Sequence, residues 1–379
     1  MKFQFGASRC IFGRDSSLEI SGYAAQRGCS RLLCVCDEGV KKAGLVAPVI
    51  AALEEKGLSV TVFDRVLPDP AIEIAEEAAQ MARDCGAEGV LAIGGGSSLD
   101  TAKLAAVLAG GQIPLREVLK GQEISHEPLV LIAVPTTSGT GSEVTPAAVV
   151  TDLENNRKVT LVNDKLRPAC AVLDPALTLG LPKGITAATG MDALAHAMES
   201  MTCILHNPIS DGLALQAMRL LKEYLPRCVE NGTDLDARSQ VMIAATIAGM
   251  AFGNTAAHAG HGMAHAMGAN WHIPHGMACA ISLPFAIRLC EPAMGGQLQQ
   301  MAAALGLDGA GEGAAAALSR WVVSFRDSLG MPSLSGLKVD ESLLEQVAQA
   351  CMKERMLQLS GVPVTVEMCR DYLRNMLSE

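Results

Sequence analysis

The chain contains 379 residues, of which 49% are hydrophobic and 18% are charged. This composition is too apolar for a disordered chain and is sufficient for a large buried core, and the length indicates two domains or one large domain. With 30 Lys and Arg against 40 Asp and Glu, the net charge is −10. Because neutralising phosphates requires a basic surface, this charge argues against nucleic acid as a partner.

No stretch of the sequence approaches the roughly 20 apolar residues that span a bilayer, and the N-terminus lacks the apolar run of a secretory signal. The longest apolar stretch, 241–252, is interrupted by Thr246 and Gly249. Most of the twelve cysteines occupy apolar contexts, which indicates buried free thiols in a reducing compartment. We therefore expect a cytoplasmic protein with no membrane partner.

The first half of the chain alternates between β-rich runs and helical segments. The sequence predicts strands at 31–36, 58–63, 89–93, 129–134 and 169–173, and helices at 41–55 and 71–83. Strands separated by helices of about 12 residues are typical of βαβ units with a parallel sheet. Two further β-rich segments, 147–151 and 158–162, flank a turn-like DLENNR and are predicted to form a hairpin.

From about Ile185 the composition changes. Ala, Met and Leu dominate at helical spacing, and no convincing strand follows before the C-terminus. This shift puts a domain boundary near Leu181 to Lys183. The predicted fold is an α/β domain with a parallel sheet at 1–182, followed by an all-helical domain at 183–379.

Two glycine-rich turns each follow a predicted strand. Residues 94–103, GGGSSLDTAK, open a helix, and residues 135–143, PTTSGTGSE, combine glycines with hydroxyls. Such turns place free backbone N–H groups and a helix N-terminus where a phosphate can bind, although a plain strand–helix turn is an alternative for GGGS alone. Ligands of open α/β sheets bind at the carboxyl ends of the strands. Asp37, which ends the first predicted strand, either accepts from ribose hydroxyls or caps the next helix.

Five of the eight histidines fall between positions 258 and 275. His261 and His265 share one face of a predicted helix, whereas His275 follows Pro274 in a predicted turn. Asp192 and His196 are one helical turn apart. These spacings indicate a site of three histidines and one aspartate, a donor set that suits Fe(II) or Zn and does not choose between them. The alternative, ordinary polar positions on helices, is our interpretation of His126 and His206.

Four motifs together resemble the iron-dependent (group III) alcohol dehydrogenases. They are GGGSSLDTAK, PTTSGTGSEVT, TGMDALAHAMES and the spacing of HGMAH and HG with nine residues between them. The resemblance extends from about residue 3 to about residue 350. It implies a dinucleotide-binding domain at 1–182 and a metal-binding catalytic domain at 183–379. It also implies NAD(H) and one divalent metal as cofactors, with Fe(II) first and Zn second, and a homodimer or larger homo-oligomer.

The resemblance also assigns roles to individual residues. The metal ligands would be Asp192, His196, His261 and His275, and His265 would be the catalytic histidine near the nicotinamide. Asp37 matches an acidic position that favours NAD over NADP. The residues that the resemblance implies for cofactor binding are Asp37, Asp69, Gly95, Gly96, Ser97, Asp100, Thr136, Thr137, Thr140 and Lys158.

The resemblance implies that the enzyme interconverts a short-chain aldehyde and its primary alcohol by hydride transfer. Phe252 and Trp271 are the obvious aromatic candidates for a pocket wall, which fits a small substrate. A non-catalytic nucleotide- or metal-binding regulator is disfavoured because such a protein needs no metal beside a nicotinamide.

Two segments depart from the family pattern. The family usually reads Pro-Leu-Gly where this chain has residues 266–268, AMG, and an Asn-Pro-Arg segment where it has 351–361, CMKERMLQLSG. The second departure leaves open a substrate with an anionic group, sulfoacetaldehyde or phosphonoacetaldehyde. Its anion would bind basic and polar residues of this segment: Lys353, Arg355, Gln358 and Ser360. The alternative, which we favour, is that Lys353 and Arg355 are solvated charges on a helix face.

Overall fold

The computed structural model describes residues 2–111, 113–155, 157–307 and 313–378. The chain forms two compact units. One is Gly6–Leu179, and the other begins at Gly180 and includes the N-terminal segment that ends at Phe5. The functional assignment of 1–182 and 183–379 to cofactor and metal binding stays a prediction.

The first unit is built on a six-stranded parallel sheet in the order β1-β8-β5-β4-β2-β3. The predicted α/β class is confirmed, and the five predicted strands are all present. Strand β1 is not anticipated by the sequence analysis, since RCIF is short and none of its four residues is buried. The strands of this sheet are β1 (Arg9–Phe12), β2 (Arg31–Asp37), β3 (Ser59–Val66), β4 (Gly89–Gly94), β5 (Val130–Pro135) and β8 (Cys170–Leu173).

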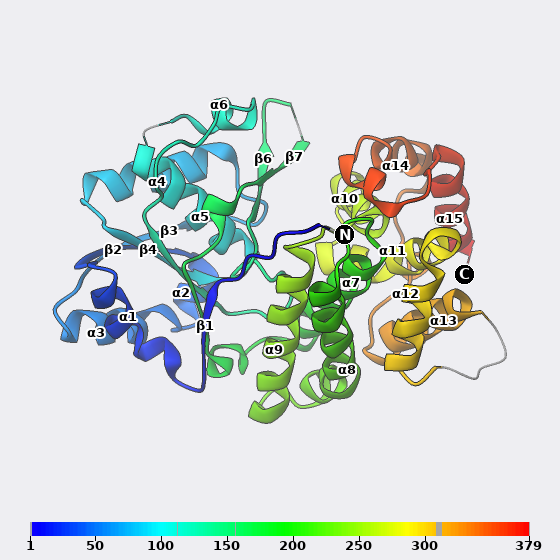
Figure 1. The fold of residues 1–379 in the computed structure, drawn as a ribbon, viewed down its shortest axis with the longest axis horizontal. Helices are drawn as coiled ribbons and strands as arrows, with labels where there is room; N and C mark the ends of the chain where they lie inside the picture. The colour runs from blue at the N-terminus through cyan, green and yellow to red at the C-terminus, as the bar shows by residue number, and fades with distance from the viewer. Residues whose placement is uncertain (1, 112, 156, 308–312, 379) are drawn as a thin grey trace. The chain divides into compact units, whose positions relative to one another are not determined.

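Helices cover both faces of this sheet (Figure 1). Helices α1 (Ile20–Gln26) and α3 (Val46–Glu55) pack on one face, and α4 (Ile72–Asp84) and α5 (Gly96–Gly111) pack on the other. Alternate side chains of β2 enter the two cores: Leu33 lies with α4 and α5, and Cys34 with α1 and α3. Because both faces are buried, the central strands are continuous apolar runs.

The single helix predicted for 41–55 is wrong. The structure has α2 (Glu38–Lys42) and α3, with Gly44 between them at φ 78°. A left-handed glycine ends one helix and lets the chain turn before the next begins. A short α6 (Leu115–Leu119) was not predicted. The predicted hairpin is present as antiparallel strands β6 (Ala147–Asp152) and β7 (Arg157–Val162).

The second unit is helical, as predicted, and its described residues contain no strand (Figure 1). Buried Ala, Met and Leu side chains form its core, which explains why long helices of low amphipathicity fold here. The turn predicted at His275 is wrong. This residue is the first of α11, because Pro274 at φ −54° leads directly into the helix. The helices are α7 (Lys183–Thr202), α8 (Pro208–Glu230), α9 (Leu235–Phe252), α10 (Ala259–Trp271), α11 (His275–Leu289), α12 (Glu291–Ala304), α13 (Ala314–Ser328), α14 (Leu344–Cys351) and α15 (Val366–Ser378).

Within the described ranges, no single helix has both the length and the apolar character to cross a membrane. Helices α11 and α12 meet such a criterion only when they are taken as a pair, and they are bent by 114° at their junction.

Candidate active site

The sheet of the first unit has a switch point between β2 and β4. The chain passes from β2 to β3 at one edge and then returns to β4 on the other side of β2. The connections therefore diverge at the carboxyl ends of β2 and β4, where open α/β sheets bind their ligands. Asp37 ends β2, and Gly94 ends β4. Ser98 Oγ donates to Asp37 Oδ2 at 3.1 Å, so these two predicted features adjoin each other.

Asp37 also caps α2, since its Oδ1 accepts from the backbone N–H of Val40 at 2.9 Å. The helix-cap interpretation of this residue therefore holds. It does not exclude a ribose contact, because a carboxylate has about four acceptor sites and two are used by Val40 and Ser98.

The two glycine-rich turns lie side by side. Thr136 N donates to the carbonyl of Gly94 at 3.0 Å, and a Cβ on Gly96 would lie 2.9 Å from Thr140 Cγ2. Gly94 itself has φ 156°, and a Cβ there would lie 2.5 Å from Ser98 Oγ. A side chain at either glycine would therefore fill the space at the N-terminus of α5. The first N–H groups of that helix have no intrahelical acceptor, which is the chemistry that binds a phosphate.

Three other predicted cofactor residues, Asp100, Asp69 and Lys158, have hydrogen-bond or ion-pair partners within the first unit. Asp100 is engaged within the unit, because its carboxylate accepts from Ser142 Oγ at 2.5 Å and from Val149 N at 2.9 Å. It therefore fixes the second glycine-rich turn and the start of β6. Asp69, at φ 53° between two prolines, forms an ion pair of 2.7 Å with Lys158 on β7. The structure thus pairs these two predicted residues with each other.

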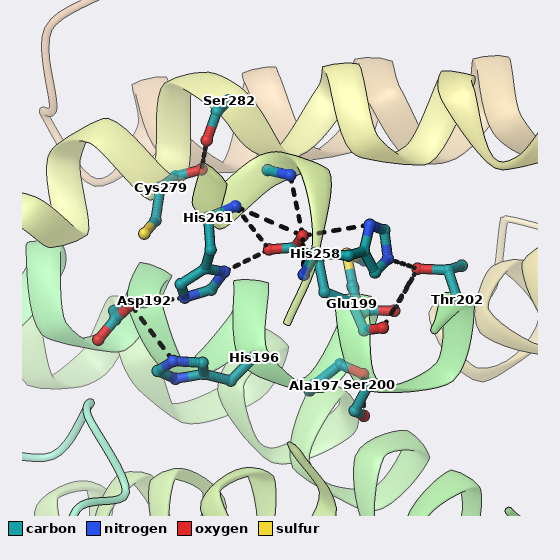
Figure 2. Close-up of polar contacts among 12 residues, drawn as sticks. Asp192, His196, Ala197, Glu199, Ser200, Thr202, His258, His261, Cys279 and Ser282 are labelled. Atoms are coloured by element: carbon teal, nitrogen blue, oxygen red, sulfur yellow. Dashed lines mark hydrogen bonds and ion pairs between the residues drawn. The ribbon is translucent and has the colours of Figure 1, made fainter. Parts of the chain in front are cut away.

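In the second unit, the four predicted metal ligands come together. Figure 2 shows Asp192, His196 and His261 of this set. Asp192 and His196 project from α7, His261 from α10, and His275 from the first residue of α11. Asp192 Oδ1 lies 3.4 Å from Nε2 of His275, 3.5 Å from Nε2 of His261 and 3.9 Å from Nε2 of His196. The side chains are buried except that of His275, which is 38% exposed.

Two atoms of this cluster show that it suits a cation. Asp192 Oδ1 and His261 Nε2 are buried, and neither has a hydrogen-bond partner among the described residues. An unpaired buried polar atom is costly, and a cation between these atoms would satisfy both. Burial by itself would raise the pKa of Asp192, but His196 and His275 outweigh it and hold that pKa well below its usual range. The carboxylate is therefore ionised, as a metal ligand must be.

Glu199 of α7 organises the histidine of α10. The N-cap residue of α10, His258, makes no side-chain cap, and Glu199 supplies one instead. Its carboxylate accepts from the backbone N–H groups of His258 and Gly260, both at 2.9 Å, and of His261 at 3.1 Å. It also accepts from His261 Nδ1 (Figure 2). In the neutral form of His261 this bond puts the ring proton on Nδ1, so that Nε2, which lies toward Asp192, is the acceptor nitrogen.

The surroundings of Glu199 are themselves buried and polar. His258 is fully buried, and its Nε2 lies 2.8 Å from Thr202 Oγ1. Burial alone would raise the pKa of Glu199, but His261, His258 and the N–H donors lower it to about 2. Glu199 is therefore a carboxylate throughout the physiological range.

His265, the predicted catalytic histidine, lies beside this cluster. Its ring centroid is 5.5 Å from that of His275, and its Nδ1 lies 3.3 Å from Glu354 Oε2. Burial lowers the pKa of His265, although Glu354 opposes that effect. The neutral ring can therefore donate from Nδ1 to Glu354 and accept a proton at Nε2.

Three residues near the cluster were not selected from the sequence: Glu199, Glu354 and Cys279. Spacing could have indicated two of them, because Glu199 is three residues after His196 and Cys279 is four after His275, which puts each on the face of a predicted ligand. Glu354 gave no such signal, since it lies 89 residues from His265.

The two aromatic candidates for a pocket wall differ in their surroundings. Phe252 stacks on the ring of His196, with centroids 4.0 Å apart. Trp271 ends α10, and its Nε1 donates to the carbonyl of Asp340 at 2.8 Å. Phe252 is therefore in contact with a predicted metal ligand, whereas the contact of Trp271 is to the backbone at Asp340.

Comparison with known families gives the class of this protein. Residues 7–175 match the family described as iron-containing alcohol dehydrogenase, and residues 186–377 match its C-terminal counterpart, the Fe-containing alcohol dehydrogenase family. The chain therefore belongs to the iron-containing alcohol dehydrogenase family and is an oxidoreductase. The resemblance drawn from the motifs is confirmed.

Individual relatives cover nearly the whole chain. The NAD-dependent methanol dehydrogenase of Bacillus methanolicus is 33% identical over 374 residues, which is 97% of each chain. Among solved structures, a 1,3-propanediol oxidoreductase has a TM-score of 0.94 at 30% identity, over 99% of this chain and 100% of that one. The sulfoacetaldehyde reductase of Bifidobacterium kashiwanohense in complex with NAD+ has a TM-score of 0.92 at 29% identity, over 100% and 99%.

Proposed function

We propose that this enzyme uses NAD(H) and one divalent metal to interconvert a short-chain aldehyde and its primary alcohol. The observation that carries the proposal is the group of Asp192, His261 and His275, in which Asp192 Oδ1 and His261 Nε2 are buried and have no hydrogen-bond partner among the described residues. The names of its relatives support NAD(H) as the cofactor and a small alcohol as the substrate.

The metal-binding role belongs to Asp192, His196, His261 and His275, with Fe(II) as the first choice and Zn as the second. A metal held there supplies a Lewis acid for the oxygen of the aldehyde or alcohol. Asp192 contributes the negative charge that offsets part of the charge of the cation. Glu199 holds His261 in the tautomer whose Nε2 is free to bind.

The cofactor role belongs to the carboxyl edge of the sheet. Gly95, Gly96 and Ser97 present backbone N–H groups at the N-terminus of α5 for the pyrophosphate. The Asp37 carboxylate accepts from the hydroxyls of the adenosine ribose and would repel a 2′-phosphate, so NAD(H) is preferred to NADP(H). We assign the other contacts to three residues of the second glycine-rich turn, Thr136, Thr137 and Thr140, and to the ion pair of Asp69 and Lys158. Asp100 acts on these contacts through Ser142.

We assign proton transfer to His265. Its Nδ1–H is directed to Glu354, which leaves Nε2 to exchange a proton with the substrate oxygen directly or through the ribose hydroxyl. The depressed pKa favours the neutral form of His265 at pH 7, which is the form that accepts a proton during alcohol oxidation.

The contacts of the 351–361 segment favour a neutral aldehyde over an anionic one. Lys353, Arg355 and Gln358 are exposed, and Ser360 is buried with its Oγ 2.8 Å from the carbonyls of Leu357 and Val362. The residue of this segment that contacts His265 is Glu354, whose carboxylate would repel a sulfonate or phosphonate. Reduction of sulfoacetaldehyde or phosphonoacetaldehyde remains the second candidate, because a sulfoacetaldehyde reductase is among the similar structures.

We also propose a cytoplasmic location and a homodimer or larger homo-oligomer. All twelve cysteines are free, and most are buried, which is consistent with a reducing compartment. The oligomeric state follows from the family resemblance.

The decisive experiment follows NADH absorbance with a panel of aldehydes, with Fe(II) or Zn supplied and with both withheld. We expect metal-dependent reduction of propanal and little activity with sulfoacetaldehyde. His275→Ala should lose metal and nearly all turnover while NADH still binds. Binding of NADH and metal without reduction of any aldehyde would instead indicate the non-catalytic regulator.

A further inference from the structure

A fully buried lysine joins α5 to the segment that follows the second glycine-rich turn. Lys103 lies on α5, two helical turns after Gly96, and its side chain is 0% exposed. Its ammonium donates to the carbonyl of Ala147 at 2.6 Å and to Thr145 Oγ1 at 3.1 Å, and it lies 3.6 Å from Asp100 Oδ1. An ammonium has three N–H groups, and these contacts give it three oxygen neighbours.

The segment that this lysine contacts has little regular structure. Residues 136–146, between β5 and β6, form neither helix nor strand; Thr137 and Thr140 are half-buried, and the other residues are buried. A buried segment of this kind must pair many of its polar groups through side chains. Ser142 makes two such bonds, because its N–H donates to Thr140 Oγ1 at 3.2 Å and its Oγ donates to Asp100 Oδ1 at 2.5 Å.

These contacts form a continuous path from Lys103 to the proposed phosphate site. Lys103 pairs with Asp100, Asp100 holds Ser142, and Ser142 holds Thr140. Thr140 in turn lies against the start of α5, since its Cγ2 would be 2.9 Å from a Cβ on Gly96. Helix α5 therefore carries both the N-terminal N–H groups proposed for the pyrophosphate and the cation that fixes the turn beside them.

The charge of Lys103 does not by itself stabilise the fold. Burial lowers its pKa to about 8, although Asp100 and Glu143 oppose the shift. The loss of hydration thus outweighs the attraction of the nearby carboxylates. A buried charge of this kind contributes little to stability but can fix one arrangement of its partners.

We propose that Lys103 is a positioning residue for the cofactor, and that its ammonium holds residues 140–147 in the arrangement that receives NAD(H). This inference rests on the proposed function, because it deepens the cofactor role assigned there to the two glycine-rich turns. Since its N–H groups are directed to oxygens of the protein, Lys103 acts through Asp100, Thr145 and the backbone rather than by contact with the cofactor.

The test is Lys103→Met, which keeps the length of the side chain and removes its donors. Titration of the metal-loaded enzyme with NADH, followed by NADH fluorescence, measures binding directly. We expect the Kd and the KM for NADH to rise about tenfold or more. The metal content should be unchanged, and kcat at saturating NADH should fall by no more than about twofold. A merely structural role would instead lower the active fraction, and with it kcat, while leaving the Kd of the folded protein unchanged.

The matched control is Lys222→Met in the second unit. Lys222 also donates to a backbone carbonyl at 2.6 Å, that of Leu305, and it lies on α8, which carries neither glycine-rich turn. The same substitution therefore removes the same kind of hydrogen bond at a distant place in the fold. We expect the Kd for NADH to stay at the wild-type value.

The outcomes separate this inference from the function on which it rests. An unchanged Kd for NADH in Lys103→Met refutes the positioning role and leaves the proposed function intact, as does an equal loss in Lys103→Met and Lys222→Met. A wild type that binds no NADH and reduces no aldehyde contradicts both proposals. If Lys103→Met does not fold, Thr145→Val removes one acceptor of the ammonium and keeps the side-chain shape. It should weaken NADH binding about threefold or more, and wild-type binding in this variant would overturn the inference.

Discussion

The carboxylate of Glu199 joins α7 to the start of α10 and should be essential to the geometry of His261. Replacing Glu199 by Gln keeps its shape but removes the charge and converts one acceptor oxygen into an amide donor. That amide would face only donors. They are the backbone N–H groups of His258, Gly260 and His261 and the ring Nδ1 of His261. At least one buried donor would then lose its acceptor.

The expected size of the effect follows from these contacts. Hydrogen bonds to a charged group contribute about 1.5 to 3 kcal/mol each, and leaving a buried donor unpaired costs about 1 to 3 kcal/mol. We therefore expect Glu199→Gln to lower the free energy of unfolding of the metal-free protein by about 3 kcal/mol or more. Metal affinity should fall about 10- to 100-fold, which is the usual effect of removing the partner of a ligating histidine.

Urea unfolding of the metal-free protein and calorimetric titration with Zn measure these two quantities. Glu345→Gln is the matched control, because Glu345 pairs with Arg370 and is 55% exposed. Because this surface ion pair is screened by solvent, its loss should leave the free energy of unfolding and the Zn affinity close to those of the wild type. If Glu199→Gln unfolds and binds Zn as the wild type does, the carboxylate does not organise His261, and the reasoning fails.

Three further predictions, made with four substitutions, concern other parts of the molecule. Gly276→Ala should destabilise the protein by about 1 to 3 kcal/mol, because its Cβ would lie 2.2 Å from the carbonyl oxygen of Ala188. Gly212→Ala on α8 has open space around the new Cβ and should stabilise the protein by about 0.5 to 1 kcal/mol. Thermal unfolding in which both variants shift in the same direction would contradict this prediction. Asp37→Ser, which retains a helix-cap hydroxyl, should raise the kcat/KM ratio of NADPH to NADH by roughly tenfold, and a wild type that already prefers NADPH would disprove the assignment. Burial lowers the pKa of Lys103 from 10.5 to about 8 in the folded protein, although Asp100 opposes the shift. At Lys103 the unfolded chain therefore binds more protons between these pH values, so the stability of the wild type relative to Lys103→Met, measured by urea unfolding at each pH, should rise with pH across that window by up to about 1.4 kcal/mol per pH unit.

The sequence by itself determined the elements with strong local signals. Apolar runs such as 129–134 predicted the central strands because both faces of a parallel sheet are buried, and Ala-rich periodicity predicted the helical unit. Helical spacing was enough to relate Asp192 to His196. The glycine-rich motifs and the histidine spacing also indicated the family, which the whole-chain comparisons confirm.

Only the tertiary structure decided which residues share a site across helices. His261 and His265 occupy one helix face, yet His261 faces Asp192 and His265 faces Glu354, because α7 and the segment after α14 lie against successive turns of α10. The role of Glu199 as the cap of α10 depends on the packing of α7 beside the start of α10, and no sequence period encodes that packing. Local periodicity specifies the face of one helix, whereas a metal site requires three faces to meet, and their meeting is fixed by the close packing of the core.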